Sequence, residues 1–307
     1  MKVLIGVDGS TGGFAAVRLA GRMLDAQRDA VLLYYAPPDL SWRSGAAATP
    51  EILQRARHAL TDTVFAEARR QLPKPLGEAA QTIIGEQKPH QGVLAAADEH
   101  RADLVVVGAR GAGPIEGLTL GSVGRAVVHH ATIPVLIARP RPGAAPADKL
   151  RVLLACDGSD ASKEAAAALS KFTWPEGAIG RVITVVESML VGHVPEWLQE
   201  QARDVDTEAM ARAWVEEHQQ EKKQAHDRLV AYCPELPEIF HNQEPLVAEG
   251  HPSEEILKAV EATRCDLVAV GARGLGFVSR LILGSTSEKL LARAPCSLLI
   301  VREHRQP

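Results

Sequence analysis

The sequence predicts two consecutive α/β domains, each a doubly wound parallel sheet with helices on both faces. Three observations support this. The chain has 307 residues, about twice the usual length of one domain. Residues 3–10 recur as 152–159, and 103–139 align without gaps to 266–302 with 17 of 37 positions identical. Short apolar runs also alternate with helical stretches, the pattern of βαβ units. We therefore expect one domain over residues 1–142, a linker over 143–149 and a second domain over 150–307.

The elements of the first half follow from this alternation. Strands buried on both faces of a parallel sheet are near-continuous apolar runs. Helical stretches lie between these runs, and Ser10 or Thr11 is placed to cap the first of them. Right-handed crossovers make the arrangement Rossmann-like. The expected strands are Val3–Val7, Ala30–Tyr35, Ala79–Ile84, Leu104–Val107 and Val135–Ala138, and the expected helices include Gly12–Ala26, Gln91–His100 and Val123–Ala131, with Thr286–Ala294 in the second half.

The second half carries a net insertion of 14 residues, because the offset between the repeats grows from 149 to 163. The extra residues fall around Pro195–Cys233 and predict a longer helix. Its charged stretch, Glu216–Lys223, is interpreted as a solvated helix face in preference to a partner site. Between the halves, the Pro- and Ala-rich residues 140–147 predict a semi-rigid linker.

Composition excludes several classes of protein. A net charge of −4 and an isoelectric point near 6.3 argue against nucleic acid as a partner, which requires a basic face. No apolar run reaches the roughly 20 residues that span a bilayer, and the N-terminus leads directly into a strand. The four cysteines show no metal-ligand spacing and are expected to be reduced. We therefore expect a cytoplasmic protein without a membrane segment.

Two features of each repeat converge where ligands bind an open parallel sheet, beyond the carboxyl ends of the strands. The first is the acidic residue that ends the first strand, Asp8 or Asp157. The second is the loop after the fourth strand, where Gly-Ala-Arg-Gly is followed nine residues later by Gly-Ser in both copies. Glycine lets a backbone approach an anion closely, and each Gly-Ser opens a helix whose free amides suit phosphate.

These motifs make each half resemble a universal stress protein domain, and the chain resembles the tandem type. Both loops match the family's Gly-x2-Gly-x9-Gly-Ser/Thr signature. The resemblance implies an adenine nucleotide alpha hydrolase-like fold with five parallel strands in the order 3-2-1-4-5. It also implies bound ATP, or ADP or AMP, with Mg²⁺ as an optional companion. With the loop arginines included, the expected nucleotide-binding residues are Val7, Asp8, Tyr35, Gly108, Arg110, Gly111, Gly121, Ser122 and Val123 in the first half, and Cys156, Asp157, Val185, Gly271, Arg273, Gly274, Gly284, Ser285, Thr286 and Ser287 in the second.

The two sites are not expected to be equal. The second copy continues after Gly-Ser with Thr286-Ser287, two hydroxyls available to terminal phosphate oxygens, where the first copy has Val123 and a glycine. Tyr35 is bulky at the position expected to contact adenine, where it either stacks on the base or fills the pocket. Each loop arginine either pairs with a phosphate or lies exposed on its loop. The histidine pair 129–130 is attributed to the dipole at a helix C-terminus and not to acid–base catalysis.

The predicted function is nucleotide-dependent regulation in stress physiology. The alternatives are a slow ATPase or autophosphorylating enzyme using Ser122, Ser285 or Ser287, and an interaction scaffold that binds no nucleotide. No Walker motif or nucleophile–base pair indicates catalysis, so the chain is not expected to be an enzyme. The halves are expected to pair through their last strands, Val135–Ala138 and Leu298–Val301, with an unknown protein partner and with a homodimer left open.

Overall fold

The computed structural model describes residues 1–39, 49–110, 120–139, 143, 149–187, 205–274 and 283–302. Within these residues each half alternates strands and helices as expected. The first half comprises β1 (Lys2–Val7), α1 (Thr11–Gly21), β2 (Ala30–Tyr35), α2 (Pro50–Gln71), α3 (Lys74–Ala79), β3 (Gln81–Ile84), α4 (Pro89–Glu99), β4 (Leu104–Gly108), α5 (Ser122–His130) and β5 (Val135–Ala138). The second comprises β6 (Arg151–Ala155), α6 (Asp160–Leu169), β7 (Ile179–Val186), α8 (Val205–Tyr232), two short 3₁₀ turns (Cys233–Glu235 and Glu238–Phe240), β8 (Leu246–Glu249), α9 (Pro252–Thr263), β9 (Leu267–Gly271), α10 (Ser285–Arg293) and β10 (Ser297–Val301).

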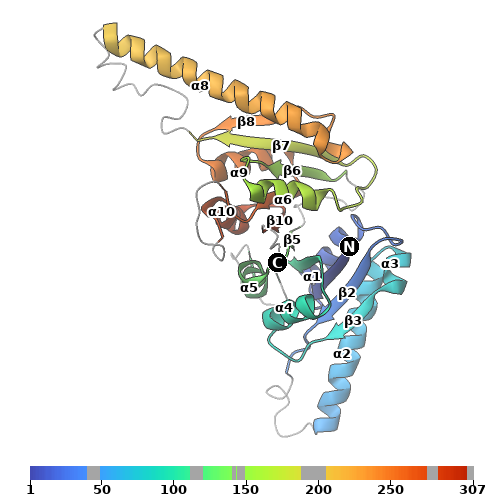
Figure 1. The fold of residues 1–307 in the computed structure, drawn as a ribbon. Coiled ribbons are helices and arrows are strands. Elements are labelled where there is room, and N and C mark those ends of the chain that lie inside the picture. The colour runs from blue at the N-terminus through green and yellow to red at the C-terminus, as the bar shows by residue number, and fades with distance from the viewer. Residues whose placement is uncertain are drawn as a thin grey trace.

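The strands form one ten-stranded sheet in the order β3-β2-β1-β4-β5-β10-β9-β6-β7-β8. From each end of the sheet inward, the strands come in the same order within their half: third, second, first, fourth and fifth. Both halves therefore have the same strand order. All pairs within a half are parallel, whereas β5 and β10 are antiparallel. Figure 1 shows the first half at one end of this sheet and the second at the other, with α8 running along β8. The prediction of two α/β domains with mostly parallel strands is confirmed.

Helices cover both faces of the sheet, and the apolar side chains form two cores. One core packs α1, α2, α6 and α8 against one face, with Val64 and Leu229 among its members. The other packs α4, α5, α9 and α10 against the opposite face, with Val127 and Leu290 among its members. Successive residues of β1 alternate between the cores, as side chains of a strand must: Leu4 belongs to the second and Ile5 to the first. Among the described residues, no helix combines the length and apolar composition required to cross a bilayer.

The two halves join through β5 and β10, as the sequence predicts. Leu298 pairs with Ile137 and Ile300 with Val135. Two arginines at equivalent positions of the repeat reinforce this joint by reaching into the opposite half. Arg139 donates to carbonyl oxygens near the C-terminus of α10, those of Leu291 and Ala294. Reciprocally, Arg302 donates to the carbonyl oxygens of Val128 and His129 in α5, at 3.0 and 3.1 Å. Each half thus caps the last helix of the other.

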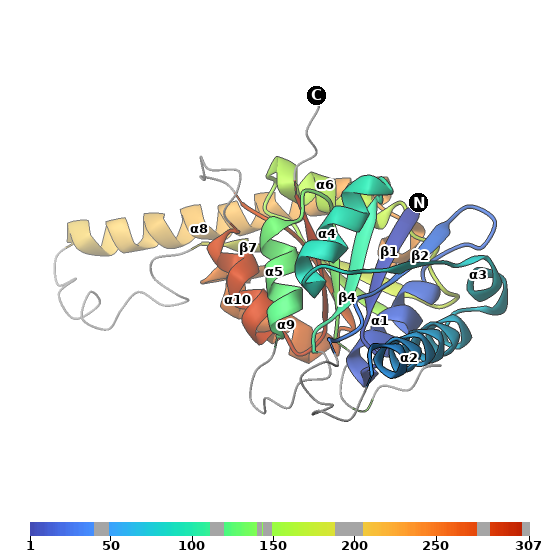
Figure 2. The same cartoon turned by 90° about the horizontal axis from the view of Figure 1, so that it is seen from below.

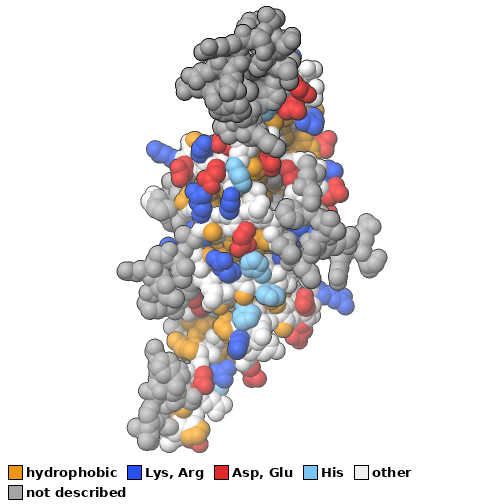
Figure 3. Space-filling model, turned by 90° about the vertical axis from the view of Figure 1, so that its left-hand side faces the viewer, with side chains coloured by type: hydrophobic (Ala, Val, Ile, Leu, Met, Phe, Trp, Pro, Cys, Tyr) orange, Lys and Arg blue, Asp and Glu red, His pale blue; other side chains and the backbone are white. Residues whose placement is uncertain are grey.

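Ion pairs also cross the joint, where α5 and α10 lie side by side in both ribbon views (Figures 1 and 2). Arg125 lies 3.5 Å from Glu288, and the Nε2 atom of His129 lies 3.4 Å from the same carboxylate. On this side of the molecule, histidines lie among basic and acidic side chains (Figure 3). The carboxylate partner of His129 therefore comes from the other half, which sequence spacing does not reveal.

Several element ends differ from the predicted ones for identifiable reasons. Helix α1 ends at Gly21 and not at Ala26, because the side chains of Asp25 and Asp29 accept backbone N–H groups and form a turn instead. The expected strand at Ala79 begins at Gln81, since the preceding segment forms the short helix α3 with proline in its first turn. The linker over 143–149 lies almost wholly outside the described residues.

Candidate functional site

The first strand of each half ends in a turn that fixes its aspartate. The Oδ1 atom of Asp157 accepts hydrogen bonds from the backbone N–H and the hydroxyl of Ser159, at 3.0 and 2.6 Å. The Ser159 hydroxyl in turn accepts from the N–H of Ser162 and caps α6. Between them, Gly158 has φ +80°, a conformation that favours glycine. The Asp-Gly-Ser motif therefore starts a helix and holds a carboxylate at the strand end.

The first half repeats this turn. Asp8 accepts from the N–H and hydroxyl of Ser10, and the Ser10 hydroxyl accepts from the N–H of Gly13 at 3.0 Å. Ser10, and not Thr11, is thus the cap of α1.

The glycine loop of the second half packs directly against this turn. An ideal Cβ placed on Gly274 would lie 2.5 Å from the Oδ2 atom of Asp157, so a larger residue would displace the carboxylate or the loop. A Cβ on Gly271 would lie 2.7 Å from the backbone of Ala161 in α6. These glycines allow the end of β9 and the start of α6 to meet.

Helix α10 begins beside these glycines with Gly284 as its N-cap. The N–H of Gly284 donates to the carbonyl of Ala272 at 2.7 Å, which fixes the helix start relative to the end of β9. Ser285 is exposed and Thr286 half-buried. Since the first N–H groups of a helix lack intrahelical acceptors and lie at the positive end of its dipole, this terminus suits an anion.

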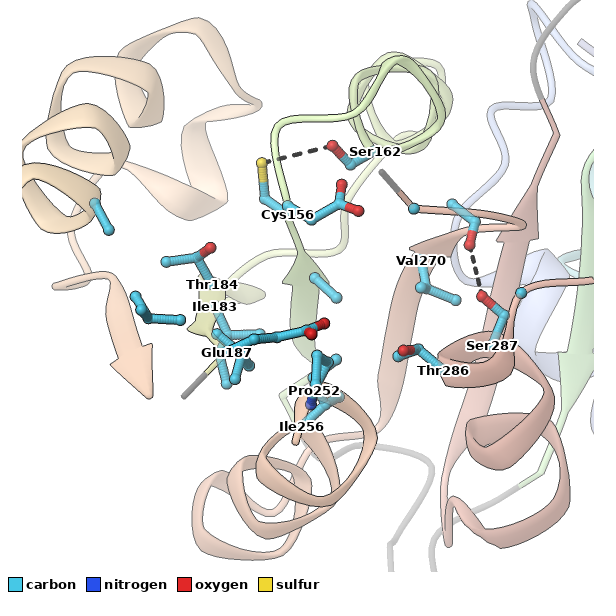
Figure 4. Close-up of a pocket in the computed structure, with 18 of the residues that line it drawn as sticks. Cys156, Ser162, Ile183, Thr184, Glu187, Pro252, Ile256, Val270, Thr286 and Ser287 are labelled. Atoms are coloured by element: carbon cyan, nitrogen blue, oxygen red, sulfur yellow. Dashed lines mark hydrogen bonds between the residues drawn. The ribbon is translucent and has the colours of Figure 1, made fainter. Parts of the chain in front are cut away.

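The structure assigns the Ser287 hydroxyl a role other than the expected one. Ser287 is 2% exposed, and its hydroxyl donates to the carbonyl oxygen of Gly271 at 2.7 Å. Its hydrogen is therefore committed to tying α10 to β9 and is not directed at a phosphate. Thr286 is the hydroxyl that points into the open space (Figure 4). In the first half the corresponding position is Gly124, which makes no such bond through a side chain.

All ten expected residues of the second half line one cavity of about 760 Å³. This volume lies within the usual range for small-molecule sites. In Figure 4, Cys156 and Thr184 lie across the cavity from Thr286. The expected residues are Cys156, Asp157, Val185, Gly271, Arg273, Gly274, Gly284, Ser285, Thr286 and Ser287.

The cavity also has walls that sequence reasoning missed. Glu187 lines it from beyond the end of β7, and Glu221, Gln224 and Arg228 line it from α8. Glu221 belongs to the charged stretch of α8; it is exposed, as a solvated face requires, and it also borders the cavity. The sequence did contain a signal for Glu187: it follows the carboxyl end of a parallel strand, where ligands bind such sheets.

In the first half the structure describes part of the expected site. A Cβ on Gly108 would lie 2.6 Å from the backbone of Gly12, and one on Gly12 would overlap the carbonyl oxygen of Arg110. The loop therefore touches the start of α1. The N–H of Gly121 donates to the carbonyl of Ala109 at 2.7 Å, just as in the second half. Gly121 caps α5, with Ser122 exposed and Val123 half-buried, whereas Gly111 lies outside the described residues.

The predicted equivalence of Tyr35 and Val185 is wrong. Gly6 pairs with Tyr34, and its repeat counterpart Ala155 pairs with Ile183, so Tyr35 corresponds to Thr184. A shift of one residue along a strand places a side chain on the opposite face of the sheet.

Tyr35 accordingly packs edge-on against Phe65 in the core beneath α2 and is 3% exposed. The residue that corresponds to Val185 is Ala36, which is small. The contact of Tyr35 with adenine stays a prediction. Tyr35 and Asp8 line a separate cavity of about 560 Å³ between α1 and α2, while Val7 is buried at the end of β1.

Each loop arginine affects the pKa of the arginine that crosses the joint between the halves. Burial lowers the pKa of Arg302, and the nearby positive charge of Arg273 lowers it further. Burial likewise lowers the pKa of Arg139; the nearby Cys296 thiol opposes this, and Arg110 adds to the lowering. Guanidinium groups nevertheless stay protonated, so each loop carries positive charge near its glycines. Arg273 lines the second cavity itself.

Comparison with known proteins identifies the family to which the chain belongs. The sequence model of the universal stress protein family matches residues 1–139 and 150–302. A universal stress protein of Mycolicibacterium smegmatis is 28% identical over 98% of this chain and 96% of its own length. One from Thermus aquaticus is 36% identical over 49% of this chain and 97% of its own length. The crystal structure of a universal stress protein from Archaeoglobus fulgidus matches with a TM-score of 0.57 at 19% identity, covering 98% of each chain. The chain belongs to the universal stress protein family and carries two of its domains in tandem.

Proposed function

We propose that the second-half cavity binds ATP or a related adenine nucleotide, and that the bound nucleotide regulates the protein's action in a stress response. One observation carries the proposal: a fixed carboxylate, a glycine-bordered backbone and the N-terminus of α10 border a single cavity. The Asp157 carboxylate accepts hydrogen bonds, as ribose hydroxyls require, and the amides of Ser285 and Thr286 suit phosphate. Ile183, Val185 and Ile256 supply an apolar wall for the base.

The same scheme is proposed for the first half, with Asp8 and the start of α5 in the corresponding roles. Gly108, Gly121 and Ser122 hold the equivalent backbone positions, and Ala36 leaves room where Val185 lies in the second half. Cytoplasmic location, the use of Mg²⁺ and the association of two chains remain predictions. Light scattering at high protein concentration tests the last of these.

The test begins with protein purified without added nucleotide. After denaturation, the released nucleotide is identified by chromatography and counted per chain. The same count is made for Gly274→Val, which places side-chain atoms against Asp157, and for Asp157→Asn, which removes charge but keeps an oxygen that can accept from Ser159. Circular dichroism verifies folding, and Glu238→Gln serves as a remote control.

Two adenine nucleotides per chain, falling to one in Gly274→Val, are expected if both halves bind. One nucleotide that disappears in this variant places binding in the second half alone. If no nucleotide is released and titration with ATP and Mg²⁺ gives no binding, the proposal fails and an interaction scaffold takes its place.

Slow hydrolysis or autophosphorylation is the alternative. The structure reduces the number of serines that could accept a phosphoryl group. The buried Ser287 hydroxyl is bonded to Gly271, whereas Ser122 and Ser285 are exposed. Incubation with γ-labelled ATP followed by peptide mapping tests this alternative. Label on Ser285 that is lost in Ser285→Ala would support it.

A further inference from the structure

One of the matched positions at which the two cavities differ lies beyond the end of the second strand of each half. The paired registers make Tyr34 equivalent to Ile183, so Pro38 is equivalent to Glu187 four residues later. Both residues line their own cavity. The first half therefore presents an uncharged proline ring where the second presents a carboxylate.

The Glu187 side chain extends into the second cavity. Figure 4 shows it and Thr286 pointing toward one another across the open space. Thr286 lies in the first turn of α10, where the proposed nucleotide places its phosphates. The carboxylate therefore faces the region that the phosphate groups would occupy.

Among the described residues, no basic side chain forms an ion pair with Glu187. The charged residues that the structure describes in the lining of the cavity are acidic Asp157, Glu187 and Glu221 and basic Arg228 and Arg273. Arg228 lies on α8, where its Nε donates to the carbonyl of Gln224 at 3.3 Å. Arg273 lies on the described part of the glycine loop, so the described lining has three acidic and two basic groups.

We infer that Glu187 selects the charge of the nucleotide in the second-half site. The site binds free ATP, whose terminal phosphates carry the most negative charge, less tightly than it would without this carboxylate. It accepts a nucleotide whose phosphate charge is reduced, either because a divalent cation is bound or because a single phosphate is present. This inference rests on the proposed nucleotide function and assigns Glu187 as a specificity-determining residue.

The size of the effect follows from Coulomb's law. A unit charge pair about 6 Å apart, at an effective dielectric constant of about 40, changes a binding constant roughly ten-fold. Replacing Glu187 by glutamine keeps the shape and removes the charge. Free ATP should therefore bind Glu187→Gln at least roughly ten-fold more tightly than it binds the wild type. The gain should shrink for AMP and for ATP with excess Mg²⁺.

Isothermal titration calorimetry on the full chain at low ionic strength tests this with three ligands: AMP, ATP with EDTA, and ATP with excess Mg²⁺. Gly274→Val provides the binding curve of the chain with the second site blocked. Glu221→Gln is the matched control, since it removes a carboxylate from the α8 wall of the same cavity. Its gain for free ATP should be smaller than that of Glu187→Gln.

The ligand arms identify the source of the reduced charge: tight Mg²⁺–ATP binding points to a metal nucleotide, and tight AMP binding to a monophosphate. An unchanged or weaker affinity of Glu187→Gln for free ATP overturns the inference while leaving the proposed function intact. An equal gain for all three ligands, or an equal gain in Glu221→Gln, overturns it as well. If no nucleotide binds the wild type or any variant, the proposed function itself fails.

Discussion

The joint between the halves contains one hydroxyl whose removal should be measurable. Ser297 opens β10, is 2% exposed, and bonds to the backbone of Arg139 in the opposite half. Its Oγ accepts from the Arg139 N–H at 3.0 Å and lies 3.2 Å from the Arg139 carbonyl oxygen, to which it donates. The corresponding residue of the first half is Pro134, which has neither a hydroxyl nor an N–H. We therefore predict that Ser297→Ala weakens the pairing of the halves.

The magnitude follows from the loss of an acceptor in a buried strand pair. Leaving a buried N–H without its acceptor costs about 1–3 kcal/mol. The alanine also creates little cavity, because a single oxygen is removed. For a chain of this length each kcal/mol lowers the melting temperature by roughly 2 °C, so a decrease of about 2–6 °C is expected.

Urea unfolding, monitored by circular dichroism, gives the free energy, and scanning calorimetry gives the melting temperature. Ser170→Ala is the matched control, because the Ser170 hydroxyl also donates to a carbonyl, that of Ala166 at 3.2 Å, but at an exposed helix end. The control should change the free energy of unfolding by less than about 0.5 kcal/mol. If Ser297→Ala is no less stable than Ser170→Ala, the hydroxyl does not hold the joint and the reasoning is refuted.

Two further predictions concern the first half. Gly12→Ala should destabilise the protein by about 1–3 kcal/mol, because the new methyl group overlaps the carbonyl of Arg110; urea unfolding measures this, and wild-type stability would contradict it. Asp29 predicts an acid-dependent loss of stability. Burial acts to raise its pKa, but the Met1 ammonium group at 2.5 Å and neighbouring N–H and guanidinium donors outweigh this and hold the pKa below its ordinary value of 3.8. A folded pKa below the unfolded one adds stability above the unfolded pKa, and this stability disappears as pH falls through the folded pKa. Asp29→Asn should therefore flatten the decline in unfolding free energy below about pH 5, and an unchanged slope would refute the assignment.

Much of the fold and of the lining of the second cavity could be predicted because both depend on rules that hold for all parallel sheets. The apolar runs Ala30–Tyr35 and Val135–Ala138 match β2 and β5 at both ends. Since the carboxyl ends of β6 and β9 meet at one edge, Asp157 and Gly274 approach each other although 117 residues separate them in sequence.

The residues that escaped prediction depend on register and on long-range packing. Strand β7 has two residues more than β2, eight against six, so the position of a residue near the end of its apolar run does not give its register. A one-residue error exchanges the faces of the sheet, which is why Tyr35 and Val185 are not equivalent. Glu221 lies on a helix with charges along its length, and only its packing beside β7 and β8 shows that this residue borders a cavity.

Comparison of equivalent positions also shows that the joint is asymmetric in charge. Arg125 and Glu288 occupy one position of the repeat and face each other across the joint, as unlike charges. Pairing two first halves would oppose arginine to arginine, and pairing two second halves would oppose glutamate to glutamate, so the joint favours unlike halves. Each chain carries one cavity lined by Pro38 and one lined by Glu187. Because one chain supplies both halves, the two cavities occur in a fixed one-to-one ratio. Any charge preference that Glu187 introduces is therefore confined to one of the two cavities of each chain.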